Sequence, residues 1–154
     1  MGQRDRHRTG PGKRRGIFGV GDPSLYDSTL RILAAVAAET DISYDVIPGI
    51  TAVQALTARH RIPLNDVGEP VLITTGRQLR AHGLSGSAVV MLDADCSFRV
   101  CPPDTRIWWG AYLGTDHELL VSGTVAEVGE QIAALRADAR ERHGWIMDTY
   151  LVRA

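Results

Sequence analysis

Two glycine-containing turns hold the residue types best suited to binding a small polar ligand. The first, residues 19–23 (Gly-Val-Gly-Asp-Pro), follows a short apolar run and precedes residues with helical periodicity. Glycine lets a ligand approach the main chain, while Asp22 and Pro23 suit the cap and first position of a helix. A strand, a glycine turn and a helix N-terminus can together hold a polar ligand. The pattern lacks the dinucleotide-binding fingerprint, so an ordinary strand-to-helix turn is the alternative interpretation.

The second turn lies one helix further along the chain. Residues 44–58 are typical of a strand, a Pro48-Gly49 break and an alanine-rich helix. The pair of turns resembles the tetrapyrrole methylase family, in which a Gly-Asp-Pro turn and a Pro-Gly-Ile-Thr/Ser segment both help to hold S-adenosylmethionine. That resemblance favours a ligand site over an ordinary turn.

Three further segments are similar to one branch of that family, the deacetylating precorrin-6A synthases. They are residues 59–65 (Arg-His-Arg-Ile-Pro-Leu-Asn), 109–115 (Trp-Gly-Ala-Tyr-Leu-Gly-Thr) and 145–151 (Trp-Ile-Met-Asp-Thr-Tyr-Leu). The likeness runs from about Gly16 to the C-terminus and covers only the C-terminal portion of the family. In the family, a longer stretch that opens with a glycine-rich first strand stands where this sequence has its basic N-terminal tail.

The resemblance implies an S-adenosylmethionine-dependent methyltransferase of corrin-ring biosynthesis. The acceptor would be carbon 1 of precorrin-5, with release of acetate. The family's cofactor contacts match Gly21, Asp22, Leu25, Thr51, Ala52, Leu92 (or Met91, one residue away) and Gly114. Residues that could bind the precorrin and assist acetate release are Tyr26, Asp93 and Tyr112, with no choice among them. For each of these residues, a packing or turn role is the alternative.

The sequence shows no catalytic triad and no metal site. Methyl transfer from a sulfonium is an in-line displacement with a good leaving group, so the protein mainly has to position donor and acceptor. Cys96 and Cys101 are the only cysteines. They lack partners at metal-ligand spacing and are expected to be reduced thiols, with no bound metal.

Composition narrows the remaining function classes. With 154 residues, 44% of them apolar, the chain can bury a core of one domain or a little more. Residues 1–16 hold six basic side chains against one acid, and the remaining 11 basic and 17 acidic residues give the body a net charge of −6. An acidic surface of this kind binds nucleic acid poorly. Two alternatives are therefore disfavoured: a basic N-terminal arm that binds nucleic acid, and an RNA 2′-hydroxyl methylase. No apolar run could span a membrane and no signal peptide is evident, so a cytoplasmic protein is expected.

Periodicity predicts an α/β chain in three parts. Residues 1–16 read as a basic disordered tail, and residues 17–48 as a βαβ remnant of the family's N-terminal parallel-sheet domain. The remnant comprises strand 17–20, helix 24–39 with an apolar stripe that should lie on a sheet, and strand 43–47. Residues 49–154 read as the mixed-sheet C-terminal domain. Its predicted elements are helix 51–59, strand 70–75, helix 76–82, strand 88–92, an antiparallel pair 106–113 and 118–122, a helix from Thr124 with a capping box to Glu127 and a stop at Gly144, and strand 145–152.

The βαβ remnant also predicts association. Its strands would have unpaired edges and the exposed apolar side chains Ile17, Phe18, Val46 and Ile47. We therefore expect a homo-oligomer, such as a dimer, or a chain that needs the missing N-terminal domain. The alternative function is a folded, catalytically inactive methylase half that acts only as a partner-dependent module.

Overall fold

The computed structural model describes residues 16–17, 19 and 21–154. The chain falls into two units, Met1–Pro48 and Gly49–Ala154, and each is described by itself. Residues 1–15 of the predicted tail lie outside the described residues, as do Phe18 and Val20 of the first predicted strand.

The described part of the first unit contains one helix, α1 (Thr29–Glu39). It begins later than the predicted helix 24–39, because Asp22 does not cap it. The Asp22 carboxylate instead accepts a hydrogen bond from the backbone N–H of Ser24 at 2.8 Å and closes a local turn. Asp27 lies at the helix start and accepts the N–H of Thr29 at 2.5 Å.

The two strands predicted on either side of α1 are not present among the described residues. Residues 43–47 form no strand, and neither do residues 17 and 19. A strand needs a neighbour for its backbone N–H and C=O groups, and the described part of this unit offers none. The apolar stripe of α1 is correspondingly uncovered: no residue of the helix is buried, and Val36 is 43% exposed. The βαβ prediction thus differs from the structure here, although the helix between the predicted strands does form.

The second unit is built on a mixed five-stranded sheet in the order β1-β2-β5-β3-β4. The strands are β1 (Val71–Thr75), β2 (Ser87–Met91), β3 (Arg106–Ala111), β4 (Leu119–Thr124) and β5 (Asp148–Arg153). Strand β1 is parallel to β2, β5 runs antiparallel to both β2 and β3, and β3 pairs antiparallel with β4. The predicted α/β class, the mixed sheet and the β3–β4 pairing are confirmed.

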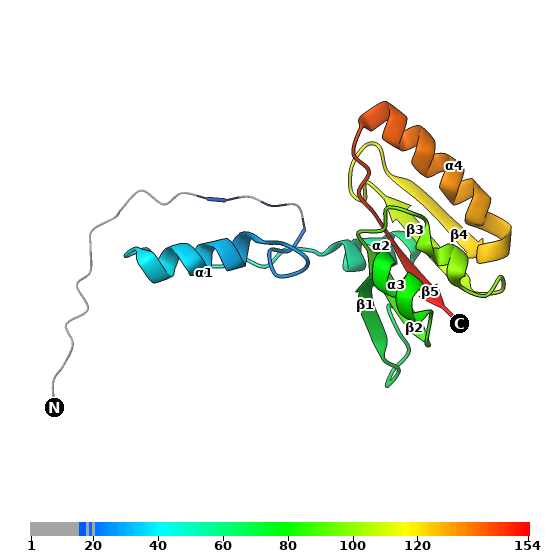
Figure 1. Ribbon diagram of the computed structural model, residues 1–154, viewed down its shortest axis with the longest axis horizontal. Coiled ribbons are helices and arrows are strands. Elements are labelled where there is room, and N and C mark those ends of the chain that lie inside the picture. The colour runs from blue at the N-terminus through cyan, green and yellow to red at the C-terminus, as the bar shows by residue number, and fades with distance from the viewer. Residues whose placement is uncertain (1–15, 18, 20) are drawn as a thin grey trace. The chain divides into compact units, whose positions relative to one another are not determined.

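Helices cover both faces of this sheet. Helix α4 (Val125–His143) runs alongside β3 and β4 (Figure 1). With α3 (Gly76–His82) and the short 3-10 helix η1 (Ser97–Val100), it encloses the main core, whose largest fully buried members include Trp109, Tyr150 and Phe98. Helix α2 (Ala52–His60) packs on β3, β4 and β5 from the other face through Val53 and Leu56, which are both buried.

Local sequence signals explain where these helices begin and lie. Thr124 and Glu127 form the predicted capping box of α4, with the Thr124 N–H bonded to the Glu127 carboxylate at 2.8 Å. Thr51 and Gln54 form a second capping box at α2, which the sequence analysis did not identify. Gly110 lets α2 lie close to the sheet, because a Cβ at that position would be 2.9 Å from Leu56 Cδ1.

Candidate cofactor-binding edge of the sheet

Three strands of the second unit end at the same edge of the sheet. Strands β2 and β3 are both antiparallel to β5, so they run in the same direction as each other and as β1. The residues that follow these three strands are Gly76, Leu92 and Tyr112. In open α/β sheets, ligands bind outside the carboxyl ends of the strands. This edge therefore holds two predicted site residues, Leu92 and Tyr112, at equivalent places after two strands.

Both of these residues adopt a strained backbone conformation. Leu92 has φ 53° and Tyr112 has φ 50°, in the left-handed region that residues with a Cβ rarely adopt. Such conformations cost on the order of 1–2 kcal/mol each and cluster at ligand sites. The Leu92 side chain is also 64% exposed, whereas Met91, the alternative contact, lies half-buried within β2. The geometry thus gives Leu92 the more open position of the two.

Gly114 lies in the loop between β3 and β4. Its φ is 79°, and a Cβ built there would meet no atom within 4 Å, so one face of this residue is open. Its N–H, in contrast, is taken: it donates to Glu118 Oε2 at 2.9 Å. A ligand contact at Gly114 would therefore use the open face and not the amide N–H.

Thr51 and Ala52 mark the N-terminal end of α2 on the other face of the sheet. The Thr51 hydroxyl accepts the N–H of Gln54 at 3.4 Å, and the Thr51 N–H donates to Gln54 Oε1 at 3.2 Å. The Thr51 side chain is thus already used in capping the helix, and Ala52 is half-buried.

Asp93 is buried directly after Leu92 and is saturated by hydrogen bonds. Its Oδ1 accepts from Ser97 Oγ at 2.7 Å and from the Asp95 N–H at 3.1 Å, and its Oδ2 accepts from the Ser97 N–H at 2.6 Å and from Tyr150 OH at 2.7 Å. Burial by itself would raise the pKa of Asp93, but these hydrogen bonds outweigh it and lower the pKa. Burial, and next the negative charge of Asp93 and the hydrogen bond to it, raise the pKa of Tyr150.

The hydroxyl of Tyr112 is engaged as well. It donates to the backbone carbonyl of Trp145 at 3.0 Å, and the Tyr112 N–H donates to Met147 O at 3.0 Å. These bonds tie the end of β3 to the segment that leads into β5. The polar atoms of Tyr112 and Asp93 therefore support the edge of the sheet in this structure.

Arg136 of α4 is a residue of this edge that sequence reasoning missed. Its Nε donates to Asp148 Oδ2 at 2.6 Å, and its guanidinium also donates to the carbonyls of Asp93, at 2.5 Å, and Ala94, at 3.3 Å. It thus fixes the backbone immediately after Leu92. A signal was available, because Arg136 is in helical phase with the apolar positions Ile132 and Ala139.

The remaining predicted contacts belong to the first unit. Gly21 has φ 84°, and Tyr26 is exposed with φ 51°. Asp22 closes the turn described above and Leu25, which is half-buried, donates its N–H to Asp22 O at 3.3 Å. These residues form one local turn, and those of the second unit form the sheet edge and the start of α2.

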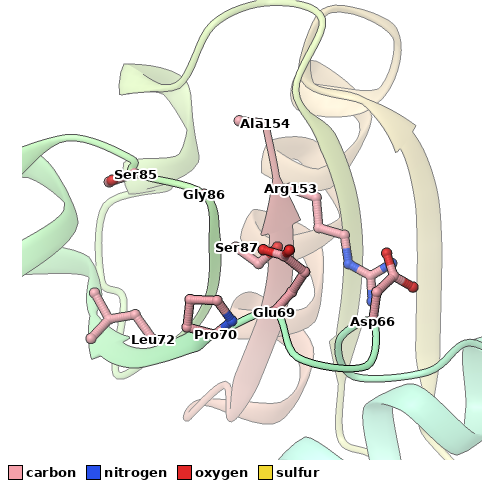
Figure 2. A pocket seen from close by; sticks show the side chains of 9 residues that line it. All are labelled: Asp66, Glu69, Pro70, Leu72, Ser85, Gly86, Ser87, Arg153 and Ala154. Atoms are coloured by element: carbon pink, nitrogen blue, oxygen red, sulfur yellow. The ribbon is translucent and has the colours of Figure 1, made fainter.

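A surface pocket of about 480 Å³ lies at the opposite edge of the sheet (Figure 2). It is lined by the segments that enter β1 and β2 and by the end of β5, including Asp66, Glu69 and Arg153. None of the predicted site residues lines it. Within the described residues, no group of three or more potential metal ligands comes together, and no helix is long and apolar enough to cross a membrane.

Comparison with known proteins shows the family of the chain. The family model of the Tetrapyrrole (Corrin/Porphyrin) Methylases matches residues 6–129. The chain belongs to this family. The resemblance predicted from the two glycine turns is thereby confirmed.

A curated relative supports the predicted branch of the family, the deacetylating precorrin-6A synthases. The chain is 56% identical, over 138 residues, to a precorrin-6A synthase (deacetylating) from a Sinorhizobium species. That alignment covers 86% of this chain and 53% of the relative. The chain thus spans about half the length of the relative it matches.

Solved structures agree with the fold. A cobalamin synthesis related protein (CobF) from Corynebacterium diphtheriae matches with a TM-score of 0.81 and 50% identity, over 86% of this chain and 58% of that one. A uroporphyrin-III C-methyltransferase from Thermus thermophilus, solved with S-adenosyl homocysteine, matches with a TM-score of 0.59 and 16% identity, over 86% of this chain and 62% of that one. At that identity the second match speaks for the fold alone.

Proposed function

We propose that this tetrapyrrole methylase chain binds S-adenosylmethionine and contributes to methyl transfer onto a precorrin-type macrocycle. The observation that carries the proposal is the 56% identity to a precorrin-6A synthase across 86% of the chain. The proposed cofactor contacts are Gly21, Asp22 and Leu25 of the first unit, and Thr51, Ala52, Leu92 and Gly114 of the second. The open face of Gly114 and the exposed, left-handed Leu92 suit close approach by a ligand.

The proposed reaction is the one that the resemblance to the deacetylating precorrin-6A synthases implies. A nucleophilic carbon of the macrocycle, carbon 1 of precorrin-5, attacks the methyl group of the sulfonium. A carbon–carbon bond forms as the carbon–sulfur bond breaks, the electron pair stays on sulfur, and S-adenosylhomocysteine leaves. Water then adds to the carbonyl carbon of the acetyl group, the carbon–carbon bond to the macrocycle breaks with its electron pair returning to the methylated ring, and acetate and a proton are released. No metal takes part in this proposal.

The contribution of the chain to such a reaction is positional. In-line displacement needs the donor and acceptor to be held close and aligned, and a rigid sheet edge does this well. Tyr26, Asp93 and Tyr112 stay as the residues proposed to contact the precorrin or assist acetate release. Of these, Asp93 and Tyr112 have hydrogen bonds within the second unit that such a role would have to replace.

Two properties of the protein belong to the same proposal. We place it in the cytoplasm, and we expect it to form a homo-oligomer or to pair with a further methylase domain. Ile17, Val46 and Ile47 are exposed in the described part of the first unit, as the association argument requires, and Phe18 lies outside the described residues. Light scattering at high micromolar concentration tests this expectation, and a monodisperse monomer would contradict it.

Binding of S-adenosylhomocysteine is the direct test of function. This chain spans 53% of the length of the relative that it matches, and each cofactor hydrogen bond supplied by the remaining part would contribute about 0.5–1.5 kcal/mol. For residues 1–154 alone we expect a dissociation constant above roughly 100 μM. An NMR titration should shift the amides of Leu92 and Gly114, and Asp22→Ala should weaken the response.

The control variant is Arg99→Met, which breaks the exposed Arg99–Glu130 pair elsewhere in the second unit and should leave binding unchanged. A titration into the millimolar range without shifts at the sheet edge would contradict cofactor binding by this chain. Methyl transfer from labelled S-adenosylmethionine to precorrin-5 then tests the reaction itself, and binding without transfer would support the inactive-module alternative.

A further inference from the structure

Two of the segments that carry the family likeness, residues 59–65 and 109–115, are joined in the structure. His60 Nε2 at the end of α2 lies 3.0 Å from the carbonyl oxygen of Trp109 in β3. The neighbouring Arg59 reaches past β3 to Glu118, at the end of the β3–β4 loop. The C-terminal end of α2 therefore holds both the strand and the loop that follows it.

Glu118 is the centre of this connection. Its Oε1 accepts a hydrogen bond from Arg59 Nε at 2.5 Å and forms an ion pair with Arg59 Nη2 at 2.5 Å, and its Oε2 accepts the N–H of Gly114 at 2.9 Å. The Glu118 side chain is only 11% exposed, whereas Arg59 is 58% exposed. The hydrogen bond from the Gly114 N–H lowers the pKa of Glu118. Burial opposes this effect, and Arg59 lowers the pKa further.

The loop itself is ordered by short-range bonds. The Thr115 hydroxyl donates to Tyr112 O at 2.8 Å, and the Glu118 N–H donates to Thr115 O at 3.2 Å. These bonds fix the shape of the loop but not its distance from α2. The Arg59–Glu118 contact supplies that second constraint.

Helix α2 carries proposed cofactor contacts at its other end. Thr51 and Ala52 stand at its start and Arg59 near its end, and a helix is a stiff rod with a rise of about 1.5 Å per residue. A loop clamped to Arg59 is therefore held at a fixed separation from Thr51 and Ala52. Without the clamp, His60 would still bond β3 at Trp109, but the loop that holds Gly114 would lose its ion pair with α2.

We propose that Arg59 and Glu118 are positioning residues, which hold the open face of Gly114 in register with the start of α2 so that both contact one S-adenosyl ligand. This inference rests on the proposed function. It gives the Arg-His pair of residues 59–60 a role that the proposed contacts do not include. Glu118 occupies the N–H of Gly114 and so directs the ligand to the side of the glycine that lacks a Cβ.

The first measurement needs no ligand. In Arg59→Met and Glu118→Gln, the Gly114 amide should exchange its hydrogen faster than in the wild type, because its acceptor is no longer held in place. Arg59→Lys keeps the positive charge and should retain most of the protection. Unchanged Gly114 exchange in all three variants would show that no clamp exists.

The second measurement is affinity for S-adenosylhomocysteine by NMR titration. Arg59→Met should weaken binding about three- to thirty-fold, the range found for residues that couple sites without touching the ligand, and Arg59→Lys should recover most of the loss. The control is again Arg99→Met, because the Arg99 side chain is about as exposed as that of Arg59 and its pair with Glu130 at 2.9 Å lies outside the β3–β4 loop. A merely stabilising ion pair would shift the unfolding midpoint slightly in both variants and affinity in neither.

The pH profile separates the clamp from a simple packing effect. Glu118 has to be ionised to hold both partners, so wild-type affinity should persist on acidification and fall only as pH drops through the lowered pKa of Glu118. In Arg59→Met that pKa is less depressed, and the fall should begin at a higher pH.

The outcomes distinguish this inference from the proposed function. Equal affinities of wild type and Arg59→Met, with altered Gly114 exchange, would overturn the positioning role alone. Absence of binding by the wild type would overturn cofactor binding by this chain, and the positioning role with it.

Discussion

Replacing Arg136 by methionine should destabilise the second unit strongly, because it breaks a desolvated ion pair. The side chains of Arg136 and Asp148 are only 10% and 5% exposed. Two nitrogens of the guanidinium bind the carboxylate, Nε at 2.6 Å and Nη2 at 3.2 Å. Methionine would fill a similar volume but would remove the cationic partner of the Asp148 carboxylate. The carboxylate would keep the hydrogen bond from the indole N–H of Trp109 at 2.8 Å. The carbonyls of Asp93 and Ala94 would lose their donor as well.

The expected cost is about 3–5 kcal/mol, the usual result of removing one partner from a buried ion pair. That is a large share of a typical total stability of about 5–15 kcal/mol. The same helix provides a matched control, since Arg142 pairs with Asp138 one turn away at 2.9 Å with both side chains exposed. Arg142→Met should cost only about 0.3–0.5 kcal/mol.

Urea unfolding followed by tryptophan fluorescence measures both variants, because the indole of Trp109 is fully buried. With a slope of about 1–3 kcal/mol/M, Arg136→Met should lower the midpoint by at least about 1 M and Arg142→Met by a few tenths. Adding Asp148→Asn to Arg136→Met should cost less than the sum of the single changes, because the stranded charge is removed. Equal small effects of Arg136→Met and Arg142→Met would refute the buried pair.

Four further outcomes are expected. Gly76→Ala should cost about 1–3 kcal/mol in urea unfolding, because its Cβ would lie 2.3 Å from Asp93 Oδ1, an atom held in place by hydrogen bonds; an unchanged midpoint would mean that Asp93 can shift freely. The lowered pKa of Asp93 contributes stability that is present above the ordinary aspartate pKa of about 3.9 and is lost as pH falls through the lowered value. Asp93→Asn should therefore reduce the loss of stability at acid pH. An identical acid dependence of stability in wild type and variant would contradict this. Burial raises the pKa of the Cys101 thiol to about 11, so alkylation by iodoacetamide at mildly alkaline pH should require unfolding, and rapid labelling of the native protein would be the contrary result. Amides of residues 88–91 in β2 should be among the most protected in hydrogen exchange, also when residues 1–48 are removed, and uniformly fast exchange there would show that residues 49–154 do not fold independently.

The sequence predicted the second unit well because its signals are local and agree with each other. Helix α4 begins at the capping box of Thr124 and Glu127 and ends at Gly144, as the residue types indicate. Strands β1 to β5 were placed to within a few residues, since apolar runs bounded by turn residues are reliable where both faces are covered. Their order in the sheet, with β5 between β2 and β3, is a tertiary property that no local pattern contains.

The first unit shows the limit of the same reasoning. The apolar pattern of residues 43–47 suits a strand, but a strand exists only through pairing, and no neighbour is present among the described residues. Helix α1 forms because helical hydrogen bonds close within the segment itself. Its apolar stripe has the composition of a face that packs on a sheet, yet no residue of α1 is buried and the described part of this unit contains no strand.

For the candidate site, the position of residues after strand ends could be predicted from the sequence, and the residues that hold them in place could not. Leu92, Tyr112 and Gly114 follow apolar runs and belong to recognisable segments. Arg59 and Glu118 lie far apart in sequence, and in each segment they look like ordinary surface charges. The packing of α2 on β3 and β4 brings them together. Contacts of this kind depend on topology and are outside the reach of motif reasoning.

The partners of Asp93 also bear on what this residue can do in the chemistry. A general base should have a pKa near the working pH and an oxygen available to take a proton. Asp93 has a lowered pKa, and its two oxygens accept four hydrogen bonds from Ser97, Asp95 and Tyr150. Protonating it would break part of this set, which shapes the chain directly after Leu92. These contacts favour a positioning role for Asp93. Asp93→Asn should lower the free energy of unfolding by more than it raises the activation free energy of methyl transfer, whereas loss of a general base would show the reverse.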